Sequence, residues 1–297
     1  MRRLLAPVFL WLLVFAGGAQ ADQPVYAKMP AHPALWTVHG PKGTAYLFGS
    51  IHILPPQVDW HTKEIDAAIA KSDTLVFELA MDDKFQARMQ DYIKTRGLLP
   101  DGQHLHDMLT PDAKKELDAE VTKLSLSPVA VDRMRPWLAG LTIEMMSIVK
   151  QNYSSSNGVD MQIQANAGGK PVIGLETIDQ QMALLAPADP KTELEAFEAD
   201  LKTSGSATTS EEVGPLLDAW MHGRVDRLAA LTKKDLAQYP NGQKLLFDDR
   251  NAAWVKQISA LLDQPKTYFI TVGAGHLAGP RGVPALLRAQ GFKVDGP

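Results

Sequence analysis

Short apolar runs that end at turn residues alternate along this 297-residue chain with longer stretches of helical periodicity. Apolar runs of four to six residues bounded by turn residues are typical of strands buried in a sheet. The sequence predicts such strands at Leu35–Val38, Thr44–Phe48, Thr74–Leu79, Lys170–Leu175 and Thr267–Val272, with a closing edge strand at Phe292–Val294. The turn at His39–Gly43 joins the first two as a hairpin.

Between these runs, apolar residues recur with the period of a helix. Asp59 is expected to cap a helix over Trp60–Lys71, and helices dominate Asp82–Ala167. Trp137–Val149 is apolar on nearly every side, which predicts a buried helix. Further helices are predicted at 248–262 and 281–290, and the low-complexity stretch Ser204–Ser210 is predicted to be a loop.

Strands therefore lie at both ends of the chain, with a helical block between them. This order predicts one α/β (α+β) domain over residues 35–297, preceded by a flexible lead-in at 22–34. We expect a central mixed β-sheet completed by the C-terminal strands, with a large helical insertion at about 82–167.

The N-terminal segment has the composition of a cleaved secretory signal. Arg2 and Arg3 precede the apolar stretch Leu4–Phe15, and Ala19-Gln20-Ala21 is an A-x-A cleavage site. The mature chain is then expected to begin at Asp22 and to be periplasmic or secreted. No later segment approaches the ~18 to 20 unbroken apolar residues of a spanning helix, so no stable membrane insertion is expected after cleavage.

Composition and motifs exclude several classes of function. The 30 Lys and Arg residues, less Arg2 and Arg3, leave 28 against 34 acidic residues, a net charge of −6 that offers no footprint for nucleic acid. The chain has no cysteine, so disulfides, thiolate ligands and cysteine nucleophiles are excluded. It also lacks the serine-hydrolase elbow, the zincin helix, the dinucleotide turn and the Walker loop.

Two predicted strands end in a glycine turn that presents a histidine. Gly49–His52 follows the strand at 44–48, and Gly273–His276 follows the strand at 267–272. Glycine permits positive φ or close backbone approach, which suits a turn that aims a side chain into a cleft. One such histidine is more often a structural residue bonded to backbone, but two in the same arrangement favour a shared site.

Glu78 is the third candidate, at the carboxyl end of the strand 74–79. A carboxylate there is costly to bury unless it is paired, hydrogen-bonded or metal-bound, and an exposed strand end is the plainer alternative. With His52 and His276 it would form a three-ligand metal set that leaves one position for water. The same trio could work without metal, with a histidine as general base and the glutamate orienting it.

Four further polar residues stand near these positions in the predicted fold. Glu176 follows a strand as Glu78 does, and Asp160 precedes a helical segment, where a helix cap is its simpler role. Arg250 and Asn251 open the helix before the second histidine turn. Arginine there would clamp a carboxylate or stabilise an oxyanion, and a surface salt bridge is the alternative.

The ordered motifs resemble those of the TraB/GumN family over about residues 35–294. They are Gly49-Ser50-Ile51-His52, Val76-Phe77-Glu78-Leu79, Gly158-Val159-Asp160, Lys170 to Thr177 with Gln180, Arg250-Asn251 and Gly273-Ala274-Gly275-His276. This family includes the Tiki-type proteases and is distantly similar to erythromycin esterases and a group of haem-binding lipoproteins. The resemblance implies a metal-dependent hydrolase in which His52, His276 and Glu78 form the site, with Arg250 and Asn251 as supporting polar groups. In the esterase relatives a similar histidine and glutamate act without metal.

The sequence thus leads to the hypothesis of an exported hydrolase with peptidase-like activity on a peptide or small-molecule substrate. Its metal would be zinc, manganese or cobalt, since only oxygen and nitrogen ligands are present. Glu176 and Asp160 would bind or orient the substrate. The alternatives are a metal-free esterase-like hydrolase, a non-enzymatic protein that binds haem, metal or a peptide, and a fold retained for interaction alone.

Overall fold

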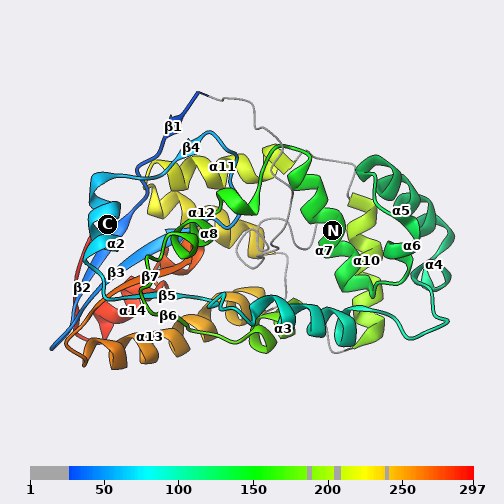
Figure 1. The fold of residues 1–297 in the computed structure, drawn as a ribbon. Coiled ribbons are helices and arrows are strands. Elements are labelled where there is room, and N and C mark those ends of the chain that lie inside the picture. Colours follow the sequence, from blue (N-terminus) through cyan, green and yellow to red (C-terminus); the bar gives the residue numbers. More distant parts are fainter. Residues whose placement is uncertain (1–26, 186–188, 204–208, 238–240) are drawn as a thin grey trace. The chain divides into compact units, whose positions relative to one another are not determined.

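A computed structural model of the chain describes residues 27–185, 189–203, 209–237 and 241–297 (Figure 1). Its centre is a six-stranded mixed sheet of order β6-β5-β7-β3-β2-β8, which confirms the predicted fold class. The strands are β2 (Leu35–His39), β3 (Thr44–Ser50), β5 (Thr74–Phe77), β6 (Val172–Gly174), β7 (Thr267–Gly273) and β8 (Lys293–Asp295). The C-terminal strands complete the sheet as expected: β7 lies inside it and β8 at its edge.

Four of these strands run in parallel. β7 pairs in parallel with β3 and with β5, and β5 pairs in parallel with β6, whereas β2 is antiparallel to both β3 and β8. The register places Ser50 of β3 opposite Gly273 of β7. The carboxyl ends of β3, β7, β5 and β6 therefore meet at one edge of the sheet, where open α/β sheets bind their ligands.

Both faces of this sheet are covered by apolar side chains. On one face, Val76 and Ile270 pack in a core cluster with Trp254 of α13 (Asp249–Leu262) and Leu287 of α14 (Val283–Ala289). On the other face, Phe48 contacts the rings of three further aromatic residues: Phe269, Trp60 and Trp220. Burial on both faces explains why β3, β5 and β7 are nearly continuous apolar runs.

Further strands, helices and turns belong to this unit, which one helix, Thr209–Met221, enters at Gly214. They are the two-residue strands β1 (Met29–Pro30) and β4 (Val58–Asp59), helices α2 (Lys63–Lys71), α8 (Val159–Ala165), α11 (Thr209–Met221) and α12 (Val225–Leu236), the 3₁₀ turns η2 (Ser155–Asn157) and η4 (Ala274–Leu277), and the π-helical turn η3 (Lys244–Asp248). The prediction that Asp59 caps α2 is wrong. Asp59 lies in β4, and Thr62 is the cap, because its side chain accepts the Ile65 N–H at 3.2 Å.

A second compact unit consists of Met81–Asn152 and Thr177–Val213. It contains the helices α3 (Phe85–Tyr92), α4 (Leu105–Met108), α5 (Pro111–Leu124), α6 (Pro128–Asp132), α7 (Pro136–Val149), α9 (Ile178–Leu185) and α10 (Pro190–Thr203), and the π-helical turn η1 (Ile93–Gly97). Between its two segments the chain returns to the sheet unit, where it supplies α8 and β6. Helices therefore occupy the middle of the chain as expected, but 153–176 belongs with the sheet and 177–213 with the helices.

The predicted signal segment 1–21 lies outside the described residues, as do positions 204–208 of the predicted low-complexity loop. Thr209 and Ser210, the next residues of that stretch, already belong to α11. Among the helices that the structure describes, none combines the length and the apolar character that crossing a membrane requires.

Candidate active site

All seven residues singled out from the sequence lie in the sheet unit. Six of them are buried, and Glu176 is nearly so: the six are His52, Glu78, Asp160, Arg250, Asn251 and His276. Glu78 and Glu176 follow β5 and β6, and His52 and His276 follow β3 and β7. The carboxyl ends of the four parallel strands thus bring residues from four distant segments together, while their catalytic roles stay predictions.

The two histidine turns pack directly against each other. A Cβ atom placed on Gly49 would lie 2.7 Å from the Cβ of Ala274, closer than real Cβ atoms approach. Gly158 has the same property, because its Cβ would lie 1.9 Å from the carbonyl oxygen of His52. Close backbone approach, one of the two reasons expected for glycine here, explains these positions.

Arg250 clamps two carboxylates at the centre of the site. Its Nη2 donates to Glu78 Oε2 at 2.6 Å, and it binds Glu176 through Nε and Nη2 at 2.7 and 2.9 Å. Nη1 donates to the carbonyl of Leu246 and to the ring of His276. All five guanidinium N–H groups are therefore engaged, and the alternative of a surface salt bridge is wrong because Arg250 is buried.

Burial and charge act in opposite directions on this group of residues. Burial raises the pKa of Glu78 above its ordinary value, although the Arg250 guanidinium and the N–H of Gly273, 2.6 Å from Glu78 Oε1, oppose this increase. Burial alone would lower the pKa of Arg250, but the carboxylates of Glu78 and Glu176 outweigh it and raise that pKa. Arg250 thus remains a fixed positive charge inside the site.

His276 is fully buried, and both of its ring nitrogens are engaged. Arginine has no acceptor, so Nε2 must accept the hydrogen bond from Arg250 Nη1 at 3.0 Å, and Nδ1 then donates to Asn251 Oδ1 at 2.6 Å. The ring lies between Phe247 and Trp254, with centroid distances of 4.6 and 4.4 Å. Burial and the charge of Arg250 hold the pKa of His276 well below 6.5, so the ring is neutral.

His52 is paired with Asp160. Its Nδ1 lies 2.5 Å from Asp160 Oδ2, and the two side chains are only 6% and 5% exposed. Asp160 lies in the first turn of α8, and the N-cap position belongs to Gly158. The Asp160 carboxylate therefore orients His52 and does not cap the helix. The close approach of Gly49 to Ala274 places the turn that carries His52 against the turn that carries His276.

The predicted three-ligand metal set does not fit this arrangement. Arg250 and the Gly273 N–H occupy the oxygens of Glu78, and Arg250 occupies Nε2 of His276. Within the described residues, no three histidine or acidic side chains are placed to hold a metal ion. With both nitrogens engaged, His276 also has none left for a haem iron. A metal would have to displace a buried guanidinium that contacts two of its expected ligands.

Sequence reasoning missed the partner of His52. The sequence favours a helix cap or a substrate-binding role for Asp160, whereas the structure pairs its carboxylate with His52. The role of Glu78 in orienting a histidine stays a prediction. The available signal was Gly158, because a glycine two residues before an acidic helical residue is typical of a place where backbone approaches closely. The aromatic walls around His276 carried no such signal.

Residues 34–296 match the model of the TraB/PrgY/gumN family. The chain belongs to the TraB/PrgY/gumN family. The match covers the whole range over which the motifs resemble this family, including both histidine turns, Glu78 and Arg250. Family membership comes from the whole ordered set and does not by itself identify a reaction.

Several family relatives resemble the chain at low identity. An uncharacterised protein of Treponema pallidum is 22% identical over 86% of this chain and 80% of its own length. The zebrafish (Danio rerio) proteins named metalloprotease TIKI1 and metalloprotease TIKI2 are each 24% identical, over 88% and 93% of this chain. The chain spans 62% and 63% of those two proteins. The uncharacterised protein YbaP of Escherichia coli is 23% identical over 82% of the chain and 87% of its own length.

Proposed function

We propose that this family member is a hydrolase in which His52 activates water as a general base. The observation that carries the proposal is the buried pair of His52 and Asp160 at the carboxyl end of the parallel strands. The carboxylate accepts the Nδ1 proton and so leaves Nε2 as the basic nitrogen, the arrangement that orients histidine in many hydrolases. His52 Nε2 takes the proton of the attacking water and returns it to the leaving group.

Arg250 is a positioning residue in this proposal. Since its five donors are all engaged, it holds Glu78, Glu176 and His276 in place rather than binding substrate directly. Asn251 fixes the tautomer of His276 and thereby keeps Nε2 available to Arg250. Together these residues supply a preorganised, buried electrostatic environment beside His52.

The substrate class that we propose is a peptide, because the TIKI relatives carry the name metalloprotease. The N-terminal signal pattern supports a periplasmic or secreted location. A metal-dependent peptidase using zinc, manganese or cobalt is the second candidate, favoured by the same relatives. It requires Arg250 to release both Glu78 and His276, so no step of the proposed reaction uses a metal.

The His52–Asp160 pair can be tested against a matched pair on the surface. His61 and Asp66 form the same Nδ1 to carboxylate contact, at 2.7 Å, but their side chains are 46% and 53% exposed. We expect Asp160→Asn to lower kcat for hydrolysis of a peptide or ester panel by roughly 10²- to 10⁴-fold, the range of general-base catalysis. Asp66→Asn should leave kcat unchanged.

Full activity in Asp160→Asn or in His52→Ala would overturn the proposal. A fall in kcat that Asp66→Asn reproduces would point to lost stability rather than lost catalysis. Circular dichroism of each variant checks that the chain still folds.

A further inference from the structure

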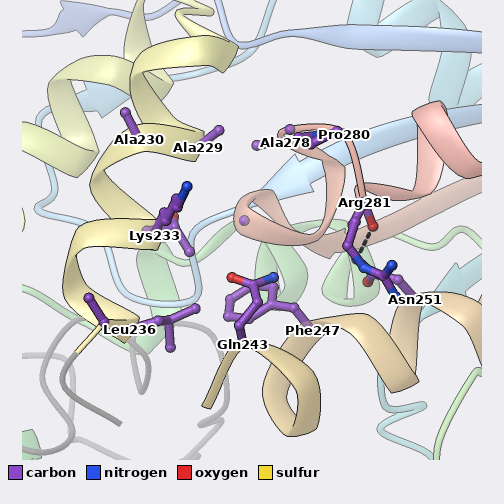
Figure 2. Close-up of a pocket in the computed structure, with 14 residues that line it drawn as sticks. Ala229, Ala230, Lys233, Leu236, Gln243, Phe247, Asn251, Ala278, Pro280 and Arg281 are labelled. Carbon is purple, nitrogen blue, oxygen red and sulfur yellow. Dashed lines mark hydrogen bonds between the residues drawn. The ribbon is translucent and has the colours of Figure 1, made fainter. Parts of the chain in front are cut away.

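The sheet unit contains a second candidate site, a cavity of about 500 Å³. Its walls come from α12, from the start of α13 with the preceding η3 turn, and from the turn at 278–281 (Figure 2). Cavities of several hundred cubic ångströms are the usual size of small-molecule sites. His52, Glu78 and Arg250 are not among the residues that line it, so it is separate from the reacting groups.

Small residues leave this space open. Ala229 and Ala230 of α12, and Ala237 directly after this helix, line the cavity at positions where larger side chains would fill it. Gly279 turns the opposite wall at φ +78, and a Cβ there would already meet the Cβ of Ala229 at 3.4 Å. The volume is therefore set by residue choice on both walls.

Two residues that line the cavity also contact His276 of the candidate active site. Phe247 lines it and packs against the ring of His276, and Asn251 lines it and accepts the His276 Nδ1 proton. Asn251 also donates to the carbonyl of Arg281 at 2.9 Å, which ties the 278–281 turn to α13 (Figure 2). A ligand in the cavity would therefore contact Phe247 and Asn251, the residues that contact His276 from the other side.

The charges on the walls are positive. Lys233 projects from α12 toward the space between the walls, and Arg281 stands across from it (Figure 2). Arg281 binds Asp248 through Nε at 2.7 Å, and Lys233 has no ion pair among the described residues. Thr232, also on the wall, has a buried Oγ1 without a hydrogen-bond partner within the described chain.

We propose that this cavity binds a carboxylate carried on an apolar chain or side chain. The apolar part would fill the space between the alanines and Phe247, and the carboxylate would pair with Lys233. This pairing is charge-assisted and leaves the apolar walls covered. A fatty acid and the free C-terminus of an apolar peptide share this chemistry.

Isothermal titration calorimetry with sodium octanoate and octanamide tests the proposal. We expect octanoate to bind, and Lys233→Gln to weaken its affinity by roughly 3- to 10-fold, as for a partly exposed ion pair. Lys234→Gln is the matched control, because Lys234 is the next residue and does not line the cavity. Ala230→Phe, which places a ring in the cavity at an exposed helix position, should abolish binding.

Two further arms identify the source of the carboxylate and separate this proposal from the hydrolase. Acetyl-leucyl-leucine with a free carboxylate represents a peptide terminus; binding of either this dipeptide or octanoate supports the site, and the tighter one indicates its source. Octanoate binding should persist in His52→Ala, since His52 does not line the cavity. Equal binding of octanoate and octanamide, no binding of either acid, or full binding by folded Ala230→Phe would overturn the proposal.

Discussion

Replacement of Arg250 by methionine tests whether the buried charge cluster holds the site together. The guanidinium is 7% exposed, and Glu78 and Glu176 beside it are 3% and 9% exposed. Methionine keeps the apolar stem but leaves two nearly buried carboxylates without a counter-charge. Removing one partner of a buried ion pair typically costs about 3–5 kcal/mol, because the remaining charge is buried and uncompensated.

The assay is urea unfolding at pH 7, with Arg224→Met as the matched control. Arg224 pairs with Asp218 at 2.9 Å, but both side chains are more than half exposed, so its loss should cost less than about 1 kcal/mol. Adding Glu78→Gln to Arg250→Met should recover part of the loss, since it removes one of the two stranded charges. A loss in Arg250→Met no larger than that in Arg224→Met would refute this account of the cluster.

Three further predictions follow from other contacts of the sheet unit. As pH falls below about 6.5, His276 is protonated in the unfolded chain before it is protonated in the folded one. The folded state should therefore lose stability by up to ~1.4 kcal/mol per pH unit. His276→Gln should reduce this pH dependence of the urea midpoint between pH 7 and 5.5, and an unchanged dependence would contradict the buried neutral ring. Gly158→Ala should displace the carbonyl of His52, lower the free energy of unfolding by about 1–3 kcal/mol and abolish activity. Gly214→Ala is the control: nothing lies within 4 Å of a Cβ there, so in thermal melts it should be neutral or stabilising. Thr62→Ala should lower the free energy of unfolding by about 0.5–2 kcal/mol through loss of the α2 cap, again measured in thermal melts. A smaller effect than that of Asp59→Ala would mean that Asp59 is the cap after all.

The sequence predicted the centre of the sheet well because β3, β5 and β7 are buried on both faces. β3 and β7 are continuous apolar runs ending in glycine, so their ends and their two histidine turns could be read directly. Parallel strands end at a common edge, which is why residues as distant as His52 and His276 were expected together. The same reasoning placed Glu78 and Glu176 at the ends of β5 and β6.

The pairing within the site could not be read in this way. Which carboxylate meets which histidine depends on how α8 and α13 lie against the strand ends, and periodicity carries no information about that. Asp160 was therefore interpreted as a cap or a substrate ligand, although it contacts His52. Arg250 was seen as a clamp, but its simultaneous contacts with Glu78, Glu176 and His276 depend on the packed helix.

The most direct test of the central claim is the rate of peptide or ester hydrolysis before and after exhaustive chelation, with His52→Ala beside the wild type. The account predicts that the chelated wild type, shown by elemental analysis to be free of metal, keeps its activity and that His52→Ala loses it. Activity that vanishes on chelation and returns with one equivalent of zinc, manganese or cobalt would contradict it, and would mean that Arg250 gives way to a metal.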